Sequence, residues 1–156
     1  KRAEKSSEGI GFTPKAKKLS KDFTNNKGKL PWPVTKGVIS GKFGNQKHAV
    51  YEHLTTINNG IDIITNSGTK ARSVFKGKVA AVIVLPGGKK AVLIQHGEFF
   101  TMYSNLAKVF VNKGDEVTTR EDIATVLTDE NGKTEIHFEI WQGNQKQNPG
   151  FWIVPN

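Results

Sequence analysis

Strict alternation of polar and apolar residues near the C-terminus constrains the fold of this chain more than any other feature. From Thr134 to Trp141 the sequence reads Thr-Glu-Ile-His-Phe-Glu-Ile-Trp. A β-strand turns successive side chains to opposite faces, so this pattern predicts a strand. One face carries Glu135, His137 and Glu139 and is available for chemistry. The other face is apolar and is expected to pack into a core.

The rest of the chain also favours β-structure. Short runs rich in β-branched and aromatic residues recur after residue 34, and turn residues separate them. Pro86-Gly87-Gly88-Lys89 and Gly97-Glu98 each fit a reversal between neighbouring runs. With 156 residues, the chain suits one domain with a modest extension. We therefore predict a mainly β fold, an antiparallel sheet or sandwich. The predicted strands include residues 37–44, 78–85, 90–96 and 99–103.

The N-terminal segment carries most of the basic charge. Its first 30 residues hold nine Lys or Arg and three Asp or Glu, a balance of +6 within a whole-chain charge of +9. Thr13-Pro14 fits a helix N-cap followed by proline at the first helical position. Leu19 and Phe23 give this short N-terminal helix an apolar edge, so we expect it to dock on the domain. Docking across the functional groove is one form of this expectation. The predicted organisation is a basic linker over 1–30, with a short helix at about 14–23, followed by a β-domain over 31–156.

An ordered set of motifs resembles the LytM-type zinc peptidases, which cut cell-wall peptide bridges. The resemblance lies in Asn58-Asn59-Gly60-Ile61-Asp62, in Tyr103-Ser104-Asn105-Leu106 and in the strand around His137. The glycine turn Lys76-Gly77-Lys78 and the closing Gln147-Asn148-Pro149-Gly150-Phe151-Trp152 match as well. The similarity spans roughly residues 31 to 156. It implies a LytM-like sheet of the duplicated hybrid motif type.

The same resemblance implies a degenerate zinc site. The family's metal ligands fall on Asn58, Asp62 and His137, and its two non-ligating catalytic histidines fall on Asn105 and Glu135. A catalytic zinc needs three ligands drawn from His, Asp, Glu or Cys, whereas Asn58 offers only a weak amide oxygen. Asn105 does not titrate near neutral pH, so it cannot relay a proton. We expect no metal, no other cofactor and no catalytic activity.

Within this family the chain resembles EnvC-like murein hydrolase activators, in which the zinc site has decayed and the domain switches on a separate cell-wall amidase. Leu30-Pro31-Trp32-Pro33-Val34 adds to this likeness. The resemblance implies a non-enzymatic activator in cell separation, located in the bacterial periplasm or envelope. A signal peptide and a coiled coil usually precede such a domain; since the chain begins at Lys1, we interpret it as a fragment or processed form. The implied partner-binding groove comprises Asn58, Asp62, Tyr103, Asn105, Glu135 and His137.

Two alternatives stay open. In a zinc peptidoglycan endopeptidase with relocated ligands, His53 or His48 completes a site with Asp62 and His137, and Glu135 acts as the base. The second alternative is a scaffold module that binds peptidoglycan without cutting it. Nucleic acid is not an expected partner, because no recognised motif accompanies the basic charge. No hydrophobic run approaches the roughly 18 residues of a membrane span, and the absence of cysteine excludes disulfides.

Overall fold

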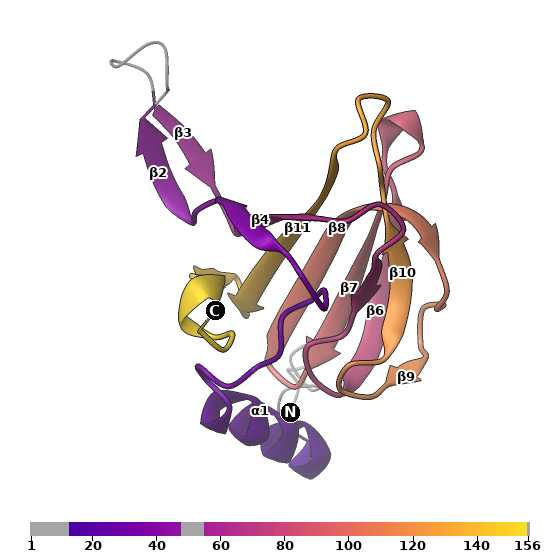
Figure 1. Ribbon diagram of the computed structural model, residues 1–156. Coiled ribbons are helices and arrows are strands. Elements are labelled where there is room, and N and C mark those ends of the chain that lie inside the picture. Colours follow the sequence, from indigo (N-terminus) through magenta and orange to yellow (C-terminus); the bar gives the residue numbers. More distant parts are fainter. Residues whose placement is uncertain (1–12, 48–54, 156) are drawn as a thin grey trace.

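The computed structural model describes residues 13–47 and 55–155 and is built mainly of strands, with one α-helix before them (Figure 1). This confirms the fold class predicted from the sequence, which was mainly β with a short N-terminal helix. The elements in chain order are α1 (Pro14–Asn25), β1 (Val38–Gly41), β2 (Gly44–Lys47), β3 (Thr55–Asn58), β4 (Ile61–Thr65), β5 (Lys70–Arg72), β6 (Gly77–Val84), η2 (Pro86–Gly88), β7 (Lys90–His96), β8 (Phe99–Val109), β9 (Glu116–Val117), β10 (Asp122–Val126), β11 (Thr134–Gln142), β12 (Gln145–Gln147) and η3 (Pro149–Phe151).

The main sheet is antiparallel and runs in the order β1-β4-β11-β8-β7-β6-β9. β10 pairs with both β5 and β8, so the long strand β8 contributes to two sets of neighbours. β2 and β3 form a separate hairpin, which projects at the end of the molecule opposite α1 in Figure 1. The predicted reversals lie where expected, with η2 between β6 and β7, and Gly97 and Glu98 between β7 and β8.

The alternating segment of the sequence forms β11, which lies between β4 and β8. Its apolar side chains Ile136, Phe138 and Ile140 are fully buried, whereas Glu135 and His137 on the other face are partly exposed. The core therefore lies on one side of this strand, and the polar groups lie together on the other side.

Helix α1 docks on the sheet through Phe23. The helix starts after Thr13, whose hydroxyl accepts a hydrogen bond from the backbone N–H of Ala16 at 3.0 Å, and it ends two residues beyond the predicted position 23. The Phe23 ring is fully buried and stacks on His96 and Phe99, with ring centroids 4.9 and 4.7 Å apart. The apolar edge read from the sequence is therefore the docking edge of the helix.

The docked helix lies away from the polar face of β11. Its contact Phe99 begins β8, and Ser104, the residue that pairs with His137, is five residues further along. At 3.3–3.4 Å per residue this is about 17 Å, so α1 does not cross that face.

No helix in the described part of the chain has both the length and the apolar character needed to cross a membrane.

Residues on both sides of position 31 share one core. Leu30 is buried. Its carbonyl oxygen accepts a hydrogen bond from the Val154 N–H at 2.8 Å, and its N–H donates to the Trp152 carbonyl oxygen at 3.1 Å. Gly97 is also needed for this packing, because its φ is +71° and a Cβ there would collide with the Ser20 hydroxyl of α1. The helix is thus part of the same packed unit as the sheet.

A buried polar chain lies beneath α1. His96 hydrogen-bonds through Nδ1 to the Lys76 carbonyl oxygen at 2.7 Å, and through Nε2 to the Thr101 hydroxyl at 2.8 Å. The Thr101 hydroxyl also lies 2.9 Å from the Tyr103 hydroxyl. Burial lowers the pKa of His96 to about 4, although the hydrogen bond to the Lys76 carbonyl opposes this shift. His96 is therefore neutral near pH 7.

Replacing the Phe23 ring tests whether α1 belongs to the folded unit. We expect Phe23→Ala to lower the free energy of unfolding by about 3–4 kcal/mol, because it removes a fully buried aromatic side chain. Urea denaturation monitored by circular dichroism gives this value, and Lys21→Ala on the exposed side of α1 is the control. A loss of less than about 1 kcal/mol would show that the sheet folds without the helix.

Candidate functional site

The pairing of β4, β11 and β8 brings the predicted site residues onto one side of the sheet. His137 of β11 lies directly opposite Asp62 of β4 and opposite Ser104 of β8. Glu135 lies two residues before His137 and therefore points to the same side. We call this side of β1, β4, β11 and β8 the site face.

The His137 ring lies between two carboxylates. Its Nδ1 is 2.8 Å from Asp62 Oδ1, and its Nε2 is 2.8 Å from Glu139 Oε2. A carboxylate can only accept, so both ring nitrogens donate and the ring is an imidazolium. Burial alone would lower the pKa of His137, but the hydrogen bonds and negative charges of Asp62 and Glu139 outweigh it and raise the pKa to about 9. The ring is therefore charged at neutral pH.

Each carboxylate has a second donor that fixes its orientation. Asn58 Nδ2 donates to Asp62 Oδ2 at 2.9 Å, and Trp141 Nε1 donates to Glu139 Oε1 at 2.7 Å. Burial would raise the pKa of both carboxyl groups, but these hydrogen bonds and the interaction with His137 lower both pKa values below their usual range. We call these five residues, Asn58, Asp62, His137, Glu139 and Trp141, the His137 network.

Two glycines allow the network to form. A Cβ at Gly41 would collide with the Asp62 carboxylate, and a Cβ at Gly60 would collide with the Phe138 carbonyl oxygen of β11. The backbone N–H of Gly60 also donates to Asn58 Oδ1 at 3.1 Å. The turn before β4 therefore lies close against β11, which holds Asn58 beside Asp62.

Glu135 lies on the site face but has different partners. Its carboxylate accepts a hydrogen bond from the Ser40 hydroxyl of β1 and forms an ion pair with Lys133, whose Nζ is 3.5 Å from Oε1. The carboxylate is therefore held toward β1 and the connection before β11.

Asn105 has a backbone-linking role. Its φ is +66°, a left-handed conformation that asparagine tolerates better than most residues. Its side-chain Nδ2 donates to the Glu135 carbonyl oxygen at 2.6 Å, and its own carbonyl oxygen accepts from the backbone N–H of Leu127 at 2.9 Å. The residue at the position of a catalytic histidine thus ties β8 to its neighbours.

Tyr103 corrects one sequence-based prediction, which placed it in the partner-binding groove. It is fully buried, its ring packs on Phe138 at a centroid distance of 5.3 Å, and its hydroxyl accepts from the backbone N–H of Val74 at 3.0 Å. Neighbouring side chains of a strand point to opposite faces, and Ser104 is the residue that shares the site face with His137. The prediction of Tyr103 as a groove residue was therefore wrong, because its side chain points to the face opposite the groove.

The residues at the family's metal positions do not fit a catalytic zinc. Asn58 uses its amide to hold Asp62, and the His137 imidazolium has no free lone pair for an ion. Asp62 and Glu139 lie on opposite edges of the ring, so they do not converge on one point. No cluster of three metal-binding side chains occurs within residues 13–47 and 55–155. His48 and His53, the relocated ligands of the alternative hypothesis, lie outside the described residues.

Sequence reasoning placed Glu139 on the correct face but gave it no role, and it missed Trp141 and Ser40. The available signal was the alternation itself, because Glu139 and Trp141 follow His137 in the same strand phase.

The site face also carries an exposed apolar pair, Val38 and Ile64, which lie opposite each other on β1 and β4 and are 67% and 41% exposed.

The stability that the His137 network contributes should depend on pH. The pKa of His137 rises from 6.5 to about 9 on folding, so its contribution is complete below pH 6.5 and is lost as the pH rises through 9. The lowered pKa values of Asp62 and Glu139 add a loss on the acid side, below their ordinary values of 3.8 and 4.5. We expect His137→Gln to reduce the free energy of unfolding by about 2 kcal/mol between pH 4.5 and 6.5.

Urea denaturation of the wild type and of His137→Gln at a series of pH values measures this difference. The two proteins should converge in stability above pH 9, where the wild-type ring has lost its proton. Glu135→Gln is the control, because its carboxylate contacts Ser40 and Lys133. A difference that stays constant from pH 6 to 10 would contradict the charged state of His137.

Comparison with known proteins places this site in a family. Peptidase family M23 matches residues 56–149. The uncharacterized lipoprotein YgeR of Escherichia coli (strain K12) is 31% identical over 111 residues, which cover 70% of this chain and 41% of YgeR. The chain spans less than half the length of the curated relatives it matches.

Two solved structures have the same fold. A zinc containing peptidase from Vibrio cholerae is 28% identical with a TM-score of 0.67, covering 83% of this chain and 41% of that one. A chain of the SpoIIQ-SpoIIIAH pore forming complex is 23% identical with a TM-score of 0.66, covering 83% of this chain and 94% of that one. Together with the family match over more than half of its length, these findings show that the chain belongs to peptidase family M23.

Proposed function

We propose that this M23 domain is a non-enzymatic activator of a cell-wall amidase and binds its partner through the site face. The observation that carries the proposal is the His137 ring held between Asp62 and Glu139, with 2.8 Å contacts to each. The position that binds metal in the LytM-type family is here a charged donor. The fold around it is retained, which fits a domain selected for binding after its chemistry was lost.

The remaining site positions also argue against hydrolysis. A metallopeptidase uses its metal to lower the pKa of a bound water and a general base to move the proton. Asn105 is engaged with the backbone of β11, and the Glu135 carboxylate is engaged with Ser40 and Lys133. The residues that replace the catalytic histidines thus have structural partners of their own.

The site face has the features of a protein-binding surface. It combines the partly exposed polar groups of the His137 network with the exposed apolar pair Val38 and Ile64. β1 ends the strand order of the main sheet, next to this pair, so an amphipathic helix or an extended segment of a partner has both apolar and hydrogen-bonding groups to meet. We propose Asn58, Asp62, Asn105, Glu135 and His137 as the polar part of the interface.

Activation follows from selective binding. A domain that binds only the open form of an autoinhibited amidase shifts the amidase population toward that form. A protein of the same fold occurs in the SpoIIQ-SpoIIIAH complex, which supports a protein partner, and the relative YgeR is a lipoprotein, which supports an envelope address. We infer a role in bacterial envelope remodelling, such as cell separation.

The second candidate function is a zinc peptidoglycan endopeptidase with relocated ligands. The likeness to the zinc containing peptidase of Vibrio cholerae favours it. It requires His53 or His48 to join Asp62 and His137, with Glu135 as base. It also requires the His137 ring to lose a proton and one carboxylate partner before it can bind an ion.

Calorimetric titration with zinc near neutral pH separates these two functions. We expect no stoichiometric binding at micromolar concentrations, because the proton on His137 competes with the metal. Asn58→His supplies the missing ligand type and is expected to bind zinc measurably more tightly than the wild type. Tight binding of one zinc by the wild type, abolished by His53→Ala or His48→Ala, would establish the relocated-ligand enzyme instead.

An amidase assay tests the activator directly. The chain is incubated with each cell-wall amidase of its source organism, and dye release from labelled peptidoglycan sacculi is measured. We expect one amidase to be stimulated and Val38→Glu to reduce the stimulation at least about tenfold, because it places a charge in the apolar part of the interface. Val84→Glu on β6 is a matched control, since Val84 is 68% exposed and Val38 is 67% exposed.

Failure of every amidase to respond would count against the activator, provided a longer form of the protein is also inactive. Binding of the chain to sacculi in the absence of any amidase would favour the remaining hypothesis, a scaffold that binds peptidoglycan.

A further inference from the structure

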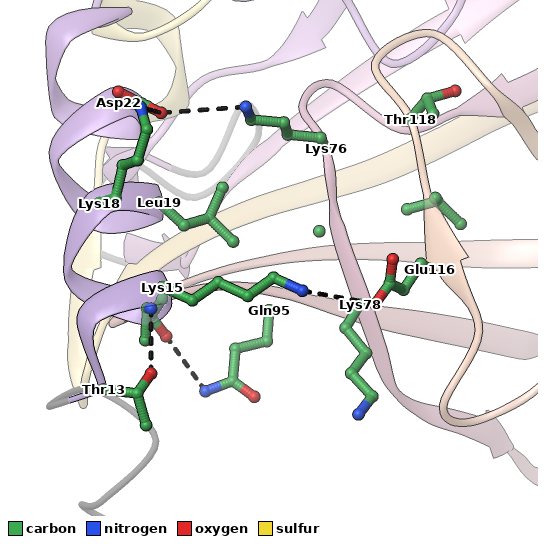
Figure 2. A pocket seen from close by; sticks show the side chains of 14 residues that line it. Thr13, Lys15, Lys18, Leu19, Asp22, Lys76, Lys78, Gln95, Glu116 and Thr118 are labelled. Carbon is green, nitrogen blue, oxygen red and sulfur yellow. Dashed lines mark hydrogen bonds and ion pairs between the residues drawn. The ribbon is translucent and has the colours of Figure 1, made fainter.

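A cavity of about 670 Å³ lies between α1 and the sheet, and no residue of the His137 network lines it (Figure 2). One wall is formed by α1 and the other by the start of β6, by β9 and by the β7–β8 turn. The helix residues that line it extend from Thr13 to Asp22, about 14 Å at 1.5 Å per residue. Cavities of this size hold small ligands in many proteins.

The cavity has an apolar lining. Ala16 and Leu19 face it from α1, and Val117 faces it from β9; Ala16 and Val117 are buried. Gly77 and Gly97 contribute backbone without side chains. Phe23 anchors the following turn of the helix in the core, so the cavity opens beside the N-terminal turns of α1. Because Ala16 and Val117 are already buried, an aliphatic chain placed here would exclude water mainly from Leu19 and from the methylene groups of the lysines that line the cavity.

The rim is strongly cationic. Lys15, Lys18, Lys76 and Lys78 line the cavity, against only two carboxylates, Asp22 and Glu116. Long lysine side chains cover apolar surface with their methylene groups and keep the ammonium group in water. Figure 2 shows Lys15 reaching from α1 toward Glu116, and Lys76 facing Asp22 across the cavity.

The two carboxylates do not neutralise this charge. Asp22 is shared, with Lys18 Nζ at 3.1 Å and Lys76 Nζ at 3.9 Å, and Glu116 pairs with Lys15 at 3.7 Å. Among the described residues, Lys78 has no carboxylate within ion-pair distance. The Lys15 and Glu116 side chains are 86% and 75% exposed, so their pair is weak and easily replaced by a stronger anion.

Several backbone groups around the cavity already have hydrogen-bond partners. The Thr118 N–H donates to Glu121 Oε1 at 2.9 Å, and the Glu98 N–H donates to the Ser20 hydroxyl oxygen at 2.8 Å. Both residues of β9 pair with β6. An extended peptide would need free backbone partners, whereas this site offers methylene surfaces and ammonium groups.

We propose that this cavity binds a small anionic amphiphile, an aliphatic chain that ends in a carboxylate or phosphate group. The aliphatic chain lies along Leu19 and the lysine methylene groups, and the anionic group meets the ammonium groups of Lys76 and Lys78. This site is separate from the site face, so its test is independent of the proposed function.

Calorimetric titration of the full chain with decanoate, near neutral pH and at low salt, tests the proposal. We expect saturable binding of one decanoate with a Kd of about 10–100 µM. Decanol has the same chain without the charge, and acetate has the charge without the chain, so each should bind at least about tenfold more weakly. Amide chemical shifts in a ¹⁵N NMR spectrum should change at Gly77, Gly97 and Val117.

Paired variants test the cationic rim. Lys76→Gln with Lys78→Gln should weaken decanoate binding about tenfold. Lys89→Gln with Lys108→Gln makes the same change in charge at two positions outside the cavity lining and should leave decanoate binding unaltered. Absence of saturable binding up to about 1 mM, equal binding of decanol, or shift changes that map elsewhere would overturn the site.

Phosphatidylglycerol vesicles distinguish a free amphiphile from a membrane surface. If the protein sediments with these vesicles and decanoate does not displace it, the lysines bind a membrane surface. That result would overturn the proposal of a ligand in the cavity. Competition between decanoate and the vesicles, abolished by the Lys76 and Lys78 changes, would support the cavity.

Discussion

The register of β11 between β4 and β8 is the constraint on which the site depends. It sets His137 directly opposite Asp62 on one side and Ser104 on the other, and the alternation of the strand then adds Glu139 to the same face. A slip of one residue would send His137 into the core and Phe138 to the surface. The fully buried Ile136 and Phe138 resist that slip, so the hydrophobic core fixes the geometry of the charged network.

Two histidines of one sheet show how burial and charged partners compete to set the charge of a ring. Burial lowers the pKa of both rings, but His96 meets a carbonyl and a hydroxyl and its pKa falls to about 4. His137 meets two carboxylates and its pKa rises to about 9. The imidazolium then compensates the negative charges of the buried Glu139 and the partly buried Asp62, a task that a divalent ion performs in zinc sites. A proton in this position leaves the carboxylates satisfied and the ring without a lone pair.

Much of the fold follows from local sequence patterns, whereas the details of the site depend on strand phase and on side-chain partners. Alternation predicted β11, and the N-cap with its apolar edge predicted α1, because both patterns act within a few residues. The sequence could not show that Tyr103 points into the core, since a family motif carries no information on phase. It also could not show that Asn105 bonds to the Glu135 carbonyl oxygen, because these residues lie thirty positions apart and meet only through the sheet.

The two candidate binding surfaces use one scaffold in different ways. On the site face, the charges of Asp62, His137 and Glu139 are held by mutual hydrogen bonds, so a partner there meets a fixed pattern. At the cavity, Lys15 and Lys76 are exposed and only weakly paired with carboxylates, so a ligand can rearrange them at little cost. Phe23 joins the cavity wall to the core under β8, and β8 reaches His137 through Ser104. An effect of a ligand beside α1 on the site face would have to pass through Phe23 or through the paired strands β6, β7 and β8, which also reach the cavity wall.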